Sequence, residues 1–216
     1  MSRMRDYDKF KELARSIRDE HGVTTSSIGL ASMRQVYRKE GIKLDLWHHK
    51  LRKLRAAYLV IDGEARVVVN ASLPPAPRLF AQCHELKHHF IDRELAEQSG
   101  LACQEELSWH DAPEREIGAE IFAAEFIYPE AEFLDDLGQA DIDSTNCEVG
   151  RVIGFKRELS MPISYTFLVK RLEWCGVIER GKFLGVRWQK REEQIYGPPV
   201  YKRIRAYRAR QASLTR

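Results

Sequence analysis

Hydrophobic positions near the start of the chain recur every three or four residues. Residues 6–21 follow this spacing up to Gly22, a residue type that commonly ends a helix. A second run with the same spacing extends from Leu30 to Tyr37 and stops at Gly41, and the TTSS sequence before it offers hydroxyl groups that could cap a helix. The pattern predicts two amphipathic helices in this part of the chain.

The spacing then changes to a period of two, which is typical of strands. IKLDLW alternates between apolar and polar positions, and AAYLVIDGEARVVVN contains two β-rich runs on either side of Asp62 and Gly63. An Asp-Gly pair between two such runs favours a tight hairpin turn. We therefore expect three strands before residue 70, the last two forming a hairpin.

Helical patterns return after a proline-rich segment at residues 74–77. Because proline interrupts regular structure, we expect one long helix to follow it over residues 78–98. An irregular stretch then extends to about Pro113, and residues 114–127 again have the spacing of a helix.

Two shorter helical patterns, residues 148–159 and 164–175, precede a basic tail. The elements together predict an α+β protein with N-terminal helices, a small sheet of antiparallel type and a C-terminal helical part. We expect a main domain over residues 1–143, a helical part over 144–186 packed on it, and a tail over 187–216. With 216 residues, of which 44% are hydrophobic, the chain can bury a substantial core.

The sequence contains neither a membrane-spanning segment nor a cysteine cluster. The charged N-terminal sequence MSRMRDYDKF lacks the apolar stretch of a signal peptide, so we expect a cytoplasmic protein without a membrane partner. The cysteines are widely spaced and form no CxxC pair, which argues against a zinc ribbon and a disulfide framework. Reduced thiols are expected at Cys83, Cys103, Cys147 and Cys175.

Charge is segregated along the chain. Residues 1–56 carry 14 Lys and Arg against 7 Asp and Glu, a net charge of +7. Residues 92–143 carry 2 against 16, or −14, and residues 187–216 carry 9 against 2, again +7. Such blocks are usually solvated surfaces that neutralise one another, although a basic tail with interleaved tyrosines could also bind nucleic acid.

Three histidines lie in the sequence CHELKHHF, residues 83–90. Residues four apart share one face of a helix, so His84 and His88 can both reach one metal ion. Glu85 stands beside them, where a carboxylate can accept a proton from water without binding the metal, as an HExxH motif requires. His89 points about 140° away from His84 and is not expected to be a ligand. A purely structural helix rich in histidine is the alternative.

A catalytic zinc site needs a third protein ligand and one open position. The segment EREIGAEIFAAEF offers glutamates, and Glu116 and Glu120 lie on the same face of the predicted helix. Spacing alone does not choose between these two. The full set of candidates is Glu114, Glu116, Glu120 and Glu125.

The segments RLFAQCHELKHHF and EIGAEIFAAEFIYP together resemble the ImmA/IrrE family of zinc metallopeptidases. In that family an arginine and a phenylalanine lead into HExxH, and the pattern E-x-x-A-N-x-F-A-A-E with a following proline comes later. The first part matches at Arg78, Phe80, His84, Glu85 and His88; the second matches at Glu116, Ala119, Phe122, Ala123, Ala124, Glu125 and Pro129. With its flanking parts, the resemblance covers about residues 6–180.

The resemblance implies a zincin-like metallopeptidase domain with a defined set of site residues. His84, His88 and Glu116 would bind zinc (Zn2+), and Glu85 would act as the general base of peptide-bond hydrolysis. Mn2+ or Fe2+ also suit such ligands. The family further implies a substrate, a helix-turn-helix transcriptional repressor whose cleavage switches on genes of mobile elements or stress responses.

The sequence departs from the family pattern at two positions. Glu120 stands where the family usually has asparagine, and Lys87 stands where a small residue is usual. An additional carboxylate near the metal could act as an alternative ligand or raise the pKa of neighbouring groups by charge repulsion. Tyr128 and His110 lie close to the motifs in sequence and could stabilise an oxyanion, but only this proximity points to them, and we expect a buried tyrosine and a surface histidine instead.

Two non-catalytic functions compete with the peptidase. In a DNA-binding module, the helices around ELSMPIS would form a helix-turn-helix, with Lys170, Arg171 and the basic tail contacting phosphates. The apolar residues of the same helix, such as Phe167 and Leu172, equally suit a core position. A regulatory scaffold that keeps only a metal site is the other alternative, and the intact Glu85 argues against it.

Overall fold

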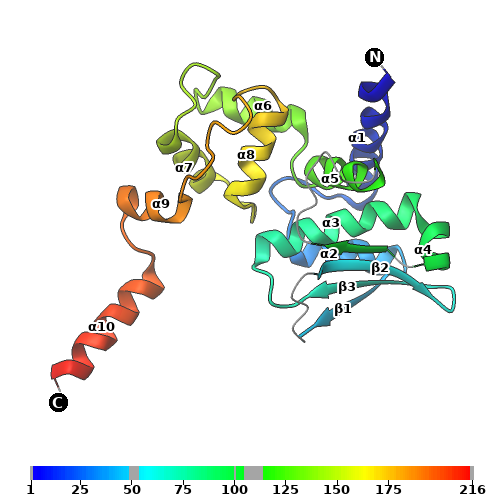
Figure 1. The fold of residues 1–216 in the computed structure, drawn as a ribbon, viewed down its shortest axis with the longest axis horizontal. Helices are drawn as coiled ribbons and strands as arrows, with labels where there is room; N and C mark the ends of the chain where they lie inside the picture. Colours follow the sequence, from blue (N-terminus) through cyan, green and yellow to red (C-terminus); the bar gives the residue numbers. More distant parts are fainter. Residues whose placement is uncertain (1, 49–53, 100, 105–113, 215–216) are drawn as a thin grey trace.

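The computed structural model describes residues 2–48, 54–99, 101–104 and 114–214, and the chain is a mixed α+β protein (Figure 1). Along these residues the elements are α1 (Ser2–His21), α2 (Leu30–Lys39), β1 (Lys43–Trp47), β2 (Leu54–Ile61), β3 (Glu64–Asn70), α3 (Pro75–Ile91), α4 (Arg93–Ser99), β4 (Leu101–Gln104), α5 (Glu114–Ile127), α6 (Glu130–Gln139), α7 (Val149–Glu158), α8 (Tyr165–Trp174), α9 (Trp188–Tyr196) and α10 (Val200–Leu214).

The predicted hairpin is present between β2 and β3. Asp62 has a φ of 52° and Gly63 a φ of 77°, so both turn residues adopt the left-handed conformation that a tight two-residue hairpin requires. The sheet order is β1-β3-β2-β4. The buried strand β3 lies between β1 and β2, and it pairs in parallel with β1 and antiparallel with β2. The sheet is therefore mixed rather than wholly antiparallel.

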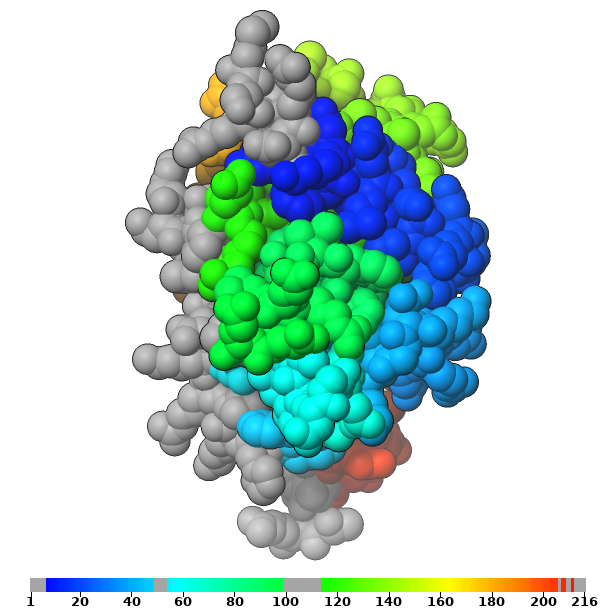
Figure 2. All heavy atoms as spheres, turned by 90° about the vertical axis from the view of Figure 1, so that its right-hand side faces the viewer, coloured from blue at the N-terminus to red at the C-terminus, as the bar shows by residue number. Residues whose placement is uncertain are grey.

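Helix α3 lies at the centre of the molecule. It packs on β2, β3 and α2 on one side and on α5 on the other, and α1 packs on α5 in turn (Figure 1). Residues 81–88 are buried without interruption, because a helix enclosed on all sides has no face left for solvent. Figure 2 shows one face of the molecule, on which α1 lies above the region of α4 and the β2–β3 hairpin lies below it.

A close approach joins α1 to α5. The Cβ of any residue larger than glycine at position 118 would lie 2.6 Å from Cζ of Phe10. Gly118 therefore lets the ring of Phe10 lie directly on the backbone of α5. This contact sets how closely α1 and α5 approach each other.

The C-terminal helical part shares its core with the rest of the chain. Buried apolar residues form one cluster that extends from Phe10 to Phe183. Glu125 of α5 and Arg171 of α8 form a buried ion pair across this boundary, with 2.6 Å between Oε2 and the guanidinium. α9 contacts α8 through the ring of Trp188, which stacks on Tyr165. α10 extends away from the other elements (Figure 1).

The single helix predicted over residues 78–98 is wrong at both ends. Pro75 and Pro77 lie in the first turn of α3 instead of preceding it, because the first turn of a helix needs no hydrogen-bonded N–H groups. The helix ends at Ile91, and Asp92 separates it from α4. The side chain of Asp92 is hydrogen-bonded to the last turn of α3.

The TTSS sequence does not cap α2. Gly29 occupies the N-cap position, and its N–H donates to the hydroxyl of Ser32 inside the helix. The hydroxyls of Thr24 and Ser27 bond to each other in a separate turn, so they are not available to α2.

Four elements were not predicted. β4 occupies part of the stretch expected to be irregular, and the rest of that stretch, residues 105–113, lies outside the described residues. The short helix α6 follows Pro129 directly, in an acidic region whose sequence was not recognised as helical. Both α9 and α10 lie in the segment treated as a basic tail.

Candidate metal centre

Helix α3 presents His84 and His88 on one face. They lie one turn apart, their ring centroids are 5.1 Å apart, and both side chains are almost completely buried. The burial of α3 fixes the backbone, so neither imidazole can turn freely toward solvent. The spacing of the HExxH sequence is thus realised as two adjacent, immobilised nitrogen donors.

Helix α5 brings Glu116 to the two histidines. Its Oε2 is 3.1 Å from Nε2 of His84 and 3.7 Å from Nε2 of His88, and the three ligand atoms all lie within 4.8 Å of one another. Burial opposes the charge on Glu116, but hydrogen bonds from the imidazoles outweigh it and hold the pKa of this carboxyl well below its usual range. Two imidazoles and one ionised carboxylate therefore converge on a single point.

Asp92 orients His88 from the far side of the ring. Nδ1 of His88 is 2.6 Å from Oδ2 of Asp92, so this hydrogen bond fixes the orientation of the ring, and a metal bound at Nε2 would keep the ring proton on Nδ1, where the carboxylate accepts it. Lys87 reaches the same Asp92 oxygen at 2.6 Å and also donates to the carbonyl of Arg115 at 3.0 Å. Lys87, a departure from the family pattern, thus links α3 to the start of α5.

Glu85 lies between the two histidines in the sequence and is enclosed by the protein. It is fully buried, and neither carboxylate oxygen makes a well-formed hydrogen bond to a described residue. Burial raises the pKa of Glu85 to about 7, although the two neighbouring histidines work in the opposite direction. A carboxylate that releases and accepts protons near neutral pH suits a general acid and base.

The other glutamates of α5 have different surroundings. Glu120 lies further from the cluster, with its Oε1 3.9 Å from Nδ1 of His84 and its Oε2 3.4 Å from Nζ of Lys170. Glu125 is buried in ion pairs with Arg171 and Arg15, and Glu114 is exposed. Of the four candidates, Glu116 is the one grouped with both histidines.

The remaining candidates from the sequence are not part of the cluster. His89 points elsewhere, as expected, and its Nδ1 lies 3.0 Å from the hydroxyl of Tyr58. Tyr128 is buried and donates its hydroxyl to Asp136, so it is not available to an oxyanion. His110 lies outside the described residues.

The surface expected of a DNA-reading helix is absent from the described α8. Arg171 is buried against Glu125, and Phe167, Leu168 and Leu172 belong to the core. These residues would have to be exposed to enter a groove of DNA. The core role, which was the alternative for this helix, is the observed one.

A metal ion fits the donor set of this centre. Two imidazole nitrogens and one carboxylate oxygen are the ligand types of a catalytic zinc site, and the buried carboxylate of Glu85 lies beside them, where water bound at such a site would supply it with a partner. A second group, Glu20, His21 and Glu40, also brings three donors together, but Glu20 is exposed and His21 already lies 2.6 Å from Glu40 in an ion pair.

Comparison with known proteins adds a family to this geometry. A family model described as the IrrE N-terminal-like domain, Peptidase_M78, matches residues 41–161, which include the four residues of the centre. No curated protein matches the chain. Among the described residues, no helix is both long enough and apolar enough to cross a membrane.

Proposed function

Because the chain belongs to the family of the IrrE N-terminal-like domain, which supports a metallopeptidase type of function, we propose that it is a zinc-dependent endopeptidase that cleaves a helix-turn-helix transcriptional repressor. The observation that carries the proposal is the convergence of His84, His88 and Glu116 beside the fully buried carboxylate of Glu85. The proposed action on a repressor that controls mobile-element or stress-response genes implies a cytoplasmic location.

In this mechanism His84, His88 and Glu116 would hold the metal, and Glu85 would transfer protons. A bound zinc ion supplies Lewis-acid activation of the scissile carbonyl group and of water. Glu85 accepts a proton from the water that attacks the carbonyl carbon, and it delivers this proton to the nitrogen of the leaving amine. Burial raises the pKa of Glu85 in the metal-free protein, which favours the protonated form that delivers the proton to the leaving amine.

The same donor set also accepts Mn2+ or Fe2+, since a carboxylate and two imidazoles suit several divalent ions. Zinc is proposed because a site of two histidines and one glutamate is characteristic of zinc peptidases. Elemental analysis of the purified protein, with His84→Ala and His88→Ala as comparisons, tests the site directly. We expect one metal ion per chain in the wild type and a large loss in both variants.

The substrate assignment is tested by co-expression with the helix-turn-helix repressor encoded next to the gene. Wild type should shorten the repressor band, and Glu85→Gln should bind the repressor and the metal without cutting. Glu12→Gln, at an exposed position of α1, is the matched control and should cut normally. An uncut repressor with wild type, in the presence of bound metal, would favour a scaffold for that partner over a peptidase.

A further inference from the structure

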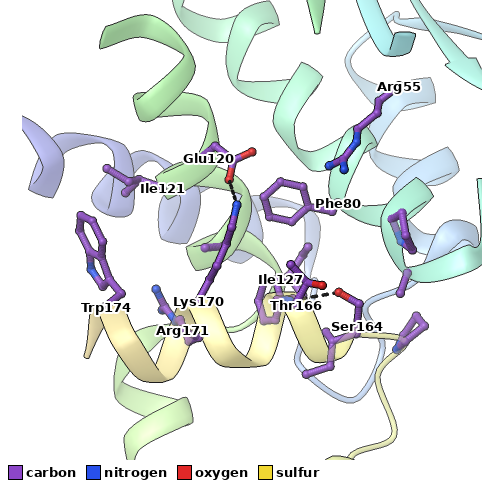
Figure 3. Close-up of a pocket in the computed structure, with 16 residues that line it drawn as sticks. Arg55, Phe80, Glu120, Ile121, Ile127, Ser164, Thr166, Lys170, Arg171 and Trp174 are labelled. Atoms are coloured by element: carbon purple, nitrogen blue, oxygen red, sulfur yellow. Dashed lines mark hydrogen bonds and ion pairs between the residues drawn. The ribbon is translucent and has the colours of Figure 1, made fainter. Parts of the chain in front are cut away.

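A pocket of about 200 Å³ lies between the metal-site helices and α8 (Figure 3). Its walls are mainly apolar, and the principal lining residues are Phe80, Ile121, Ala124, Ile163, Phe167 and Trp174. Three of these residues follow residue 161, where the family match ends, so this pocket is completed by a part of the chain that the match does not cover.

The pocket adjoins the candidate metal centre. Glu120 lines it, and Oε1 of this residue lies 3.9 Å from Nδ1 of His84. Phe80 precedes His84 by one turn of α3, and one turn rises about 5.4 Å. Since an extended peptide advances about 3.3–3.6 Å per residue, a peptide bond held at the centre would bring a side chain one or two residues away to the pocket.

We infer that the pocket receives an aromatic or branched aliphatic side chain of the peptide substrate, close to the scissile bond. This inference rests on the proposed peptidase function. An apolar cavity of about 150 Å³ in another protein accepts benzene, so a volume of about 200 Å³ accommodates a phenylalanine or leucine side chain. Lys170 and Arg171 also line the pocket, but they are paired with Glu120 and Glu125, so the interior favours an apolar group.

Arg55 supplies a polar contact beside the apolar walls. It lies on β2 where the register with β4 shifts, and such bulges commonly redirect a side chain near an active site. Figure 3 shows its guanidinium group directed toward Phe80, and its buried Nε has no hydrogen-bond partner among the described residues. A main-chain carbonyl oxygen of the substrate, next to the apolar side chain, would accept this hydrogen bond.

Binding to the zinc-loaded Glu85→Gln protein tests the pocket without turnover. The probes are acetylated Gly-Gly-X-Gly-Gly amides in which X is Gly, Ala, Leu or Phe, titrated by calorimetry. We expect the Leu and Phe peptides to bind about ten-fold tighter than the Gly peptide, because their side chains are removed from water. Equal affinity for all four peptides would overturn the inference.

Filling the pocket should remove this preference. Ala124→Phe, added to Glu85→Gln, should bind all four peptides with nearly equal affinity, whereas Ala131→Phe on the exposed face of α6 should keep the preference. Should Ala124→Phe fail to fold, Ala76→Leu fills the pocket from the first turn of α3 and decides the same question. A preference that survives in a folded filled variant contradicts the proposed location.

Arg55→Gln should weaken all four peptides alike, by about ten-fold, because the main-chain contact does not depend on X. No loss would remove Arg55 from the site.

The pocket and the peptidase function can fail separately. If protein with intact Glu85 cleaves the peptides without a preference for X, the peptidase function stands and the pocket inference is wrong. If the peptides bind with a preference for X but are not cleaved, the pocket inference stands and the peptidase function is wrong.

Discussion

At the residue scale, one carboxylate oxygen of Glu116 faces Nε2 of both histidines, whereas Glu120 approaches only Nδ1 of His84 and from a greater distance. Glu116→Ala should therefore reduce zinc affinity by more than about 100-fold, and Glu120→Ala should reduce it by less than about ten-fold and mainly alter its pH dependence. Competition with a chromogenic chelator measures both affinities. The opposite order of the two losses would assign the ligand to Glu120.

Asp92 acts on the metal through His88. Its carboxylate fixes the ring orientation at 2.6 Å, so Asp92→Ala should lower zinc affinity by about 10- to 100-fold without removing a ligand. Asp19→Ala, at an exposed position of α1, is the control and should bind zinc as the wild type does. Affinity that is unchanged by Asp92→Ala would show that packing alone holds the ring of His88.

Glu85 gives the metal-free protein a distinct pH dependence. Burial raises its pKa from 4.5 to about 7 in the folded state, so the folded protein binds the proton more tightly than the unfolded chain. The stability from this group is fully present below pH 4.5 and is lost as pH rises through 7, by about 3 kcal/mol in total.

Glu85→Gln removes this titration. In urea unfolding with a chelator present, the variant should gain stability relative to wild type between pH 5 and pH 8, because it does not bury a charge at the higher pH. A constant difference between the two proteins over this range would show that Glu85 does not titrate there.

The local part of the candidate site could be predicted from spacing, whereas the remote ligand Glu116 could be chosen only through the family resemblance. His84, Glu85 and His88 follow from spacing on a single helix, which needs no tertiary information. Choosing Glu116 over Glu120 depends on how far α5 slides along α3, which the sequence alone does not state. Asp92 was missed although it follows His88 by four residues, since the expected helix continued through it.

At the element scale, the pair Glu125–Arg171 connects α5 to α8. Both side chains are buried, so Glu125→Ala leaves Arg171 with the more distant carboxylate of Glu130, at 3.9 Å, and should cost about 3–5 kcal/mol in the free energy of unfolding. Adding Arg171→Met should recover much of this loss, because the apolar side chain needs no counter-charge. Urea unfolding of the two variants checks the sign; a cost below about 1 kcal/mol for Glu125→Ala would indicate that Arg171 finds another partner.

The elements that were predicted correctly have a strong periodic pattern or a specific turn. α1, α2, α5 and the hairpin belong to this group. β4 has four residues and is a strand only because β2 offers it an edge, a tertiary cause that local pattern does not contain. α9 begins at Trp188, whose ring stacks on Tyr165 of α8, a contact between residues that are distant in the sequence.

At the scale of the whole molecule, the charged blocks partly neutralise each other. Lys11, Arg15 and Arg18 of the basic N-terminal block pair with Glu130, Glu125 and Glu132 of the acidic block. This confirms the expectation of mutually neutralising surfaces for the N-terminal block. We propose that residues 1–143 form the catalytic domain and 144–186 a part packed on it, and the division at residue 143 stays a prediction.

The basic C-terminal helix does not contribute to this neutralisation in the same way. α10 extends from the body and exposes Tyr201 and Tyr207 together with the cations Lys202, Arg203, Arg205 and Arg208. One isolated helix does not form the charged groove that follows a single strand of nucleic acid. Truncation after Gly197 should therefore change DNA affinity by less than about two-fold and leave the salt dependence of this affinity unchanged. The same truncation should weaken the binding of a protein partner.

Binding to a labelled oligonucleotide at several salt concentrations, with and without truncation, tests the role of α10. The truncated chain keeps α9 and its stacking on Tyr165, so folding is not at issue. A steep salt slope that disappears on truncation would assign α10 to nucleic acid.

The complete enclosure of α3 has a consequence for the order of events during metal loading. Because residues 81–88 contact other elements on every side, their amide protons can exchange with solvent only when the surrounding domain opens as a unit. The imidazoles are thus already in place before any ion arrives. A chelator should strip the ion and leave slow hydrogen exchange along this helix, in contrast to a zinc finger, whose backbone becomes unprotected once its metal is removed.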